Sequence, residues 1–199
     1  GDLPDLDALG IINADLHYKG TYTKFNSEFA LNTSAGYADG VFNLDIPNEV
    51  YSGYINTKML NPGRILNDKS LLGNLNLSAK FNGTGYDIMK MNTNVIYSMT
   101  GSHIGKYDVK YSSGTIHATR GNIAMNIRHA SSMGNANVNG TVNISNFKNP
   151  VYNLKGNVQR LDVSRITGSN GDKSNLNFAF NVNGRGISPE NINGVYKLD

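Results

Sequence analysis

The chain has 199 residues, enough for one domain or two small ones with a sizeable core. Its 18 basic and 15 acidic residues leave a net charge of +3, and Lys and Arg form no run that could follow a phosphate backbone, so we expect no nucleic-acid partner. Cysteine is absent, which excludes disulfides, thiolate catalysis and cysteine-ligated metals.

Apolar and polar residues alternate along most of the chain, which predicts strands with one apolar and one polar face. The first apolar stripe contains Ile12, Ala14, Leu16 and Tyr18. The later stripes, in chain order, are Leu75, Leu77, Ala79 and Phe81; Ile123, Met125 and Ile127; Val138, Val142 and Ile144; and Leu176, Phe178, Phe180 and Val182. This alternation predicts antiparallel strands.

Turn signals recur between the stripes, about every 8 to 12 residues, which favours a meandering sheet. They include residues 38–40 (Ala-Asp-Gly), 61–63 (Asn-Pro-Gly) and 133–135 (Met-Gly-Asn). Helix is expected only as single turns, at residues 4–9, 62–66 and 163–167. We therefore predict an all-β protein.

One stretch of the sequence occurs twice, about 101 residues apart. Residues 74–77 (Asn-Leu-Asn-Leu) and 82–85 (Asn-Gly-Thr-Gly) recur as residues 175–178 (Asn-Leu-Asn-Phe) and 183–186 (Asn-Gly-Arg-Gly). A period of this length predicts a modular β array, with approximate repeats 1–100 and 101–199. Because the second copy stops early, we expect residues 1–199 to be a fragment of a longer repetitive protein.

The apolar face of such a sheet must be covered. A second sheet, closure into a barrel, or a sheet curled on itself would each do so, and the interior would be either a dry core or an apolar groove. The truncated repeat favours the open-ended, curled form. The candidate groove residues are Leu75, Leu77, Phe81, Val138, Val142, Ile144, Leu176, Phe178, Phe180 and Val182.

No residue pattern in the chain points to catalysis or to a cofactor. The four His are not spaced as metal ligands, and no nucleophile–base set stands out, so we expect neither an enzyme nor a metal or cofactor site. The glycines of the two Gly-x-Gly segments, Gly83 and Gly85, and Gly184 and Gly186, lack the third Gly and the helix start of a dinucleotide loop. We predict them to be structural turns.

The repeated phrase resembles the AsmA-like and TamB-like proteins of Gram-negative envelopes. In this chain it consists of residues 161–166 (Leu-Asp-Val-Ser-Arg-Ile), then residues 174–186 ending in Asn-Gly-Arg-Gly, then residues 193–196 (Asn-Gly-Val-Tyr). The first copy has residues 56–60 (Asn-Thr-Lys-Met-Leu) and 74–85 in the equivalent places. The likeness covers residues 40–199.

This resemblance implies a long antiparallel meandering sheet, curled on itself like a taco around an apolar groove. It also implies a periplasmic location, in a parent protein that is anchored in the inner membrane. The implied function is phospholipid transport between inner and outer membranes, outer-membrane assembly, or both. The implied partners are phospholipid acyl chains and outer-membrane assembly proteins.

Two other functions fit the same pattern. A scaffold or chaperone for outer-membrane proteins would bind their strands by adding them to a sheet edge. An extracellular adhesin or carbohydrate-binding module would use the Asn-rich polar face, although the chain has no Trp for stacking on sugars. A β-solenoid hydrolase is a weaker alternative.

Overall fold

The fold is one antiparallel sheet, seen in a computed structural model that describes residues 10–167, 174–186 and 193–198. Its strands are β1 (Asn13–Thr21), β2 (Lys24–Thr33), β3 (Gly36–Asp45), β4 (Val50–Lys58), β5 (Gly73–Asn74), β6 (Leu77–Thr84), β7 (Asn92–Ile104), β8 (Tyr107–Thr119), β9 (Asn122–Ser131), β10 (Gly134–Asn143), β11 (Val151–Leu161), β12 (Leu176–Arg185) and β13 (Asn193–Leu198). The all-β prediction and the prediction of a meandering sheet are confirmed.

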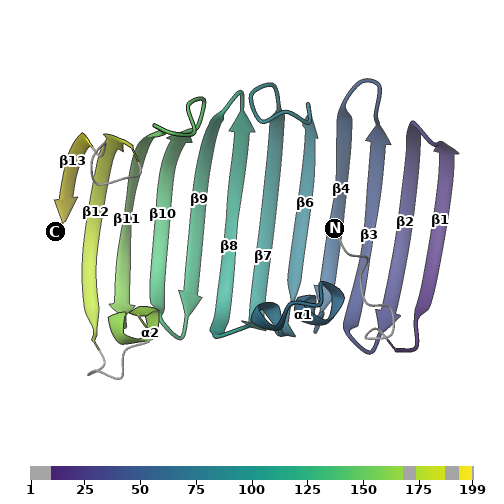
Figure 1. Cartoon of the computed structure of the whole chain (residues 1–199), viewed down its shortest axis with the longest axis horizontal. Helices are drawn as coiled ribbons and strands as arrows, with labels where there is room; N and C mark the ends of the chain where they lie inside the picture. The colour runs from purple at the N-terminus through teal and green to yellow at the C-terminus, as the bar shows by residue number, and fades with distance from the viewer. Residues whose placement is uncertain (1–9, 168–173, 187–192, 199) are drawn as a thin grey trace.

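Each long strand pairs with the strands that precede and follow it in the chain (Figure 1). The one exception is the two-residue β5, which pairs with β7, so that β4 pairs directly with β6. β1 and β13 lie at opposite ends of this order. The sheet is therefore an open meander, in which every pairing joins strands close in sequence.

The short helices all lie at one end of the strands (Figure 1). They are α1 (Pro62–Ile65), the 3-10 turn η2 (Lys69–Leu71) and α2 (Val163–Thr167). Asn61 caps α1, because its side-chain oxygen accepts a hydrogen bond from the Arg64 amide at 3.1 Å. Two of the three predicted helical turns are thus confirmed, and the third, at residues 4–9, lies outside the described residues.

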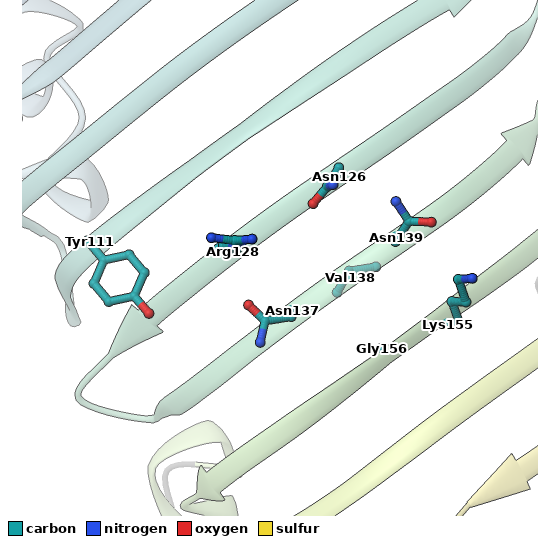
Figure 2. A pocket seen from close by; sticks show the side chains of 8 residues that line it. All are labelled: Tyr111, Asn126, Arg128, Asn137, Val138, Asn139, Lys155 and Gly156. Carbon is teal, nitrogen blue, oxygen red and sulfur yellow. The ribbon is translucent and has the colours of Figure 1, made fainter.

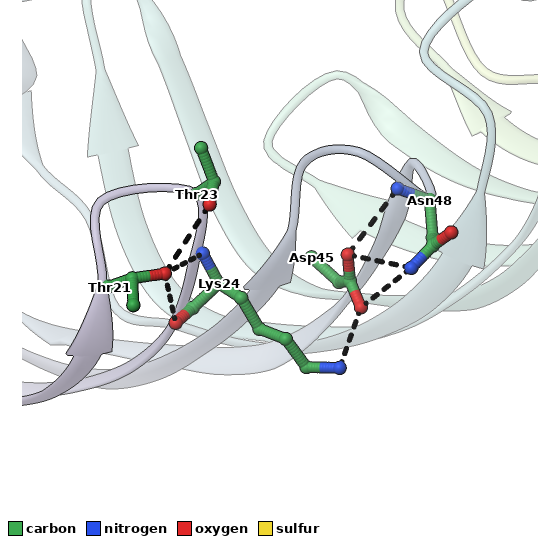
Figure 3. A network of polar contacts seen from close by, with 5 residues as sticks. All are labelled: Thr21, Thr23, Lys24, Asp45 and Asn48. Carbon is green, nitrogen blue, oxygen red and sulfur yellow. Dashed lines mark hydrogen bonds and ion pairs between the residues drawn. The ribbon is translucent and has the colours of Figure 1, made fainter.

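Polar side chains fix the hairpin turns at the other end (Figure 3). Thr21 Oγ1 accepts a hydrogen bond from the Lys24 amide at 3.1 Å. The Lys24 ammonium in turn lies 2.9 Å from the Asp45 carboxylate, which also accepts hydrogen bonds from Asn48 Nδ2 at 3.0 Å. These contacts join the β1–β2 turn to the β3–β4 turn and hold the first strands in register.

The sheet is a single layer in the part of the chain that the structure describes. Strands contact mainly their sheet neighbours, and α1 lies against η2, β5 and the β2–β3 turn, where Arg64 Nη1 donates to the Ser34 carbonyl at 3.1 Å. Among the described apolar residues only Ala35, Ala38 and Ala130 are buried, and no large side chain is fully buried. No second layer encloses a hydrophobic core between these elements.

Several contacts recur at the offset of the sequence repeat. Met59 and Arg160 both have positive φ, and their amides donate to Asn76 and Asn177 side-chain oxygens at 2.9 Å. The division of the whole chain into repeats 1–100 and 101–199 stays a prediction, as does the curling of the sheet.

The four glycines predicted as turns divide into two kinds. Gly85 and Gly186 have φ of 79° and 88°, and their amides donate to the carbonyls of Glu49 and Pro150. Such φ values favour glycine, and each of these residues directly follows the last residue of its strand, Thr84 of β6 or Arg185 of β12. Their assignment to turns stays a prediction. The prediction is wrong for Gly83 and Gly184, which lie within β6 and β12, where they pair with Tyr51 and Tyr152.

Three other predicted positions differ from the structure. Residues 38–40, predicted as a turn, lie inside β3. Leu75 lies between β5 and β6 and bridges Leu60, outside the strand it was assigned to. Ile144 follows the last residue of β10, and its amide donates to the Gly121 carbonyl at 2.7 Å.

Acid should destabilise the fold, because hydrogen bonds lower the pKa values of several carboxyls. The hydroxyl of Ser164 holds the pKa of the buried Asp162 below its usual range, and Ser70 does the same for Asp68. This stabilisation is complete above the ordinary Asp pKa of about 3.9 and is lost as pH falls through the lowered folded-state pKa.

We therefore expect the urea midpoint to be constant between about pH 5 and pH 7 and to decrease below about pH 4. The Asp162→Asn variant should have a lower midpoint at pH 7 and a shallower acid decrease. If the urea midpoint has the same pH dependence in the variant and the parent, this role of Asp162 is contradicted.

Candidate functional site

The strand register gathers the apolar residues on one face of the sheet. Directly paired residues in neighbouring strands project from the same side. One row of such pairs runs through Tyr18, Ser27, Phe42, Gly53, Phe81, Val95, Ile116, Met125, Gly140, Leu154 and Val182. The next row runs through Leu16, Phe29, Gly40, Ile55, Ala79, Tyr97, Gly114, Ile127, Val138, Gly156 and Phe180.

We call the side that carries these two rows the apolar face. Neither row contains a charged residue, and each crosses the sheet from β1 to β12. Leu77 and Phe178 belong to the adjacent row on the same side, as the pairings of β6 through β12 place them. The odd-numbered stripe of the first copy and the even-numbered stripe of the second therefore share one face.

Aromatic rings pack side by side on this face. The rings of Phe29 and Phe42 stack with centroids 5.7 Å apart, and Phe42 lies 5.7 Å from Phe81. At the other end of the sheet, Phe178 and Phe180 lie 6.5 Å apart. These side chains shield one another, so they are partly buried although no second layer covers them.

Glycines make room for these rings. Gly53 lies between Phe42 and Phe81 in its row, and the two rings meet over it. A Cβ at Gly53 would lie 3.1 Å from Phe81 Cζ and 2.1 Å from the Val41 carbonyl oxygen. Gly156 is placed in the same way, since its Cβ would lie 2.9 Å from Phe180 Cζ. Glycine at these two positions therefore leaves the space that the rings of Phe81 and Phe180 occupy.

Some of the polar groups on the apolar side are hydrogen-bonded to each other. The Tyr51 hydroxyl and Thr93 Oγ1 form a hydrogen bond that passes over Gly83, the residue between them in the row. The Tyr97 hydroxyl lies 3.2 Å from Ser112 Oγ. Apart from Ser27 and the hydroxyls of Tyr18 and Tyr97, the two central rows contain only apolar side chains and glycine.

The opposite side, which we call the polar face, carries ladders of amide side chains. Asn26 Nδ2 donates to Asn43 Oδ1 at 2.7 Å, and Asn137 Nδ2 donates to Asn157 Oδ1 at 3.0 Å. Isolated apolar residues occur here as well, such as Ile96, which is 58% exposed. A continuous apolar surface is thus restricted to one side of the sheet.

Most predicted groove residues lie on the apolar face. The strand pairing places on it Leu77, Phe81, Val138, Val142, Phe178, Phe180 and Val182. Leu176, at the start of β12, lies two residues before Phe178 and therefore projects from the same face. Leu75 and Ile144 lie just outside the strands, as described above. Sequence reasoning missed Phe25, Phe29 and Phe42 of β2 and β3, because Ser27 and Gly40 interrupt their stripes.

No family model, curated protein or solved structure matches this chain. In the described residues, no three His, Asp or Glu side chains are grouped so that they could hold a metal ion. None of the helices in the same part of the chain has the length and apolar character needed to cross a membrane.

Replacing Gly53 with Ala should disturb the apolar face directly. The added methyl group would push against Phe81 and the Val41 carbonyl, and overpacking of this kind costs about 1–3 kcal/mol of unfolding free energy. The matched control is Ser52→Ala, on the opposite face of the same strand, with an expected change within about 0.5 kcal/mol. Urea unfolding of both variants measures the difference, and equal stabilities would contradict the packing of rings over Gly53.

Proposed function

We propose that the chain is a non-enzymatic segment of an AsmA-like or TamB-like protein, in which the apolar face binds phospholipid acyl chains. The observation that carries this proposal is an apolar face that crosses the sheet from β1 to β12 with no second layer over it in the described residues. Large uncovered apolar surfaces mark sites for a partner or a lipid.

The dimensions of the face suit an acyl chain. Eleven strands at about 4.8 Å per spacing make each central row about 50 Å long. The hydrocarbon core of a bilayer is about 30 Å thick, so one lipid tail spans about half of that. A tail lying along a row would contact mainly apolar side chains and glycines, with Ser27 as the one serine in the first row, and each CH₂ removed from water contributes about 0.8 kcal/mol.

The composition of the two rows favours movement along them. They contain no charge that would trap a headgroup or repel a tail, and glycines such as Gly53 and Gly156 lie beside their phenylalanine rings. Contacts of similar strength along a row would let a tail shift from strand to strand without a deep energy minimum. Transport would then follow the long axis of the sheet, across the strands.

The cellular setting of the proposal rests on the sequence resemblance. This setting comprises a periplasmic location, a parent protein anchored in the inner membrane, and transport between the inner and outer membranes. The possible contact with outer-membrane assembly proteins has the same basis.

A scaffold for outer-membrane β-strands is the second candidate function. It is favoured by β1, a nine-residue edge strand whose residues are all exposed. Its outer edge has no strand paired to it in the described part of the chain, so a partner strand could be added there. In this function the peptide would bind at the edge and the apolar face would serve another purpose.

Photocrosslinking with matched neighbours tests the lipid proposal. A photoreactive amino acid is placed at Leu77 or Phe178 on the apolar face, and at the adjacent Ser78 or Ala179 on the polar face, in the full-length protein in cells. We expect phospholipid adducts at Leu77 and Phe178 and at most background levels at Ser78 and Ala179.

Two outcomes would contradict the proposal. Equal phospholipid adducts at all four positions would mean nonspecific contact with membrane. Adducts at Leu77 and Phe178 that are only intramolecular, or only to protein, would mean that polypeptide covers the apolar face.

A further inference from the structure

A shallow depression on the polar face gathers polar and basic side chains from four neighbouring strands (Figure 2). It has a volume of about 570 Å³, and its polar lining comes from Tyr111 of β8, Asn126 and Arg128 of β9, Asn137 and Asn139 of β10, and Lys155 of β11, with Val138 and Gly156 completing the lining. Pairing sets Arg128 beside Asn137, and Asn139 between Asn126 and Lys155. The register of the sheet therefore builds this group from residues far apart in sequence.

The depression is positively charged. Neither Arg128 nor Lys155 makes an ion pair within the described residues. β7, β9, β10 and β11 contain no Asp or Glu, and Asp108 of β8 lies 2.6 Å from His103 Nδ1, whereas the polar residues of β1 to β3 include Asp15, Glu28 and Asp39. An anionic ligand would be attracted to this part of the polar face and repelled by the other.

The remaining side chains suit a sugar. Amide groups both donate and accept hydrogen bonds, as sugar hydroxyls do, and the side chains of Asn126 and Asn139 both line the depression. Tyr111 is 46% exposed and supplies an aromatic surface beside Arg128. An arginine fork binds a carboxylate through two parallel hydrogen bonds.

The depression is long enough for more than one sugar unit. A second depression of about 290 Å³, lined by Ile96, Ser113 and Thr115, shares Asn126 and Arg128 with the first. A chain lying across β7 to β11 would meet new polar side chains at every strand, about 4.8 Å apart. An extended peptide would gain less there, because the main-chain hydrogen bonds of these strands are already used within the sheet.

We propose that the polar face from β7 to β11 binds an acidic oligosaccharide, with Arg128 and Lys155 on its carboxylates and Asn126, Asn137 and Asn139 on its hydroxyls. The site lies on the side of the sheet opposite the apolar face. It is therefore independent of acyl-chain binding, and either activity could fail without the other.

Calorimetric titration of the chain with tetragalacturonate tests this site. The double variant Arg128→Gln/Lys155→Gln should lose at least about tenfold in affinity, because each lost charge-assisted hydrogen bond is worth about 1.5–3 kcal/mol. The control variant Lys58→Gln/Lys80→Gln makes the same change in net charge on the polar face of β4 and β6, and it should bind within about twofold of the parent. Circular dichroism and urea midpoints must agree among the three proteins.

Other probes separate an acidic sugar chain from other anions. Cellotetraose, which is neutral, should bind at least about tenfold more weakly than tetragalacturonate, and so should monomeric galacturonate, inorganic phosphate and hexaglutamate. The proposal is overturned if tetragalacturonate does not bind, or if both double variants weaken its binding equally. It is also overturned if any of the other four probes binds as tightly.

Discussion

The register of the antiparallel strands is the constraint on which the rest of this structure depends. Side chains alternate between the two sides of a strand, so a slip of one residue in any hairpin would exchange the faces of every strand after it. The pairings keep Phe42, Phe81 and Val182 in a single row although they lie in β3, β6 and β12. The two chemically different faces exist because this parity is preserved through every turn.

Register also explains how a one-layer sheet packs its large side chains. Without a second layer, a ring can only pack against neighbours in its own face, so it needs a small residue beside it. Glycine in the row supplies that space, as Gly53 does for Phe42 and Phe81 and Gly156 does for Phe180. The rings gain contact with one another, and the outer surface of the face stays open to a ligand.

Much of the sheet could be predicted from the sequence, because alternation is a local signal. The stripe of Phe178, Phe180 and Val182 and the helical turn at residues 163–167 needed no knowledge of distant residues. The turn prediction was wrong at two glycines, because glycine occurs both in turns and at strand positions where a neighbouring side chain leaves no room for a Cβ atom. Gly85 and Gly186 have positive φ and follow the ends of their strands, but Gly83 and Gly184 are strand residues whose role depends on the tyrosine in the paired strand.

The candidate sites were harder to predict than the strands. The basic depression combines Tyr111, Arg128 and Lys155 from three strands, and no spacing in the sequence places them together. The phenylalanines of β2 and β3 can be assigned to the apolar face only from the strand pairing, because Ser27 and Gly40 interrupt the apolar alternation of their strands. Such groupings follow from pairing, which a single sequence does not specify for each strand.

The most direct test of the central claim, an open apolar face that accepts acyl chains, is paramagnetic NMR with a phospholipid that carries a spin label on its tail. The reporters on the apolar face are the methyl groups of Ile116, Met125, Leu154 and Val182, and those on the polar face are Ile96 and Val151, both more than half exposed. The account predicts strong paramagnetic broadening of the NMR signals of the apolar-face methyl groups and little broadening of those on the polar face. Equal broadening of both sets, or none on the apolar face, would contradict it.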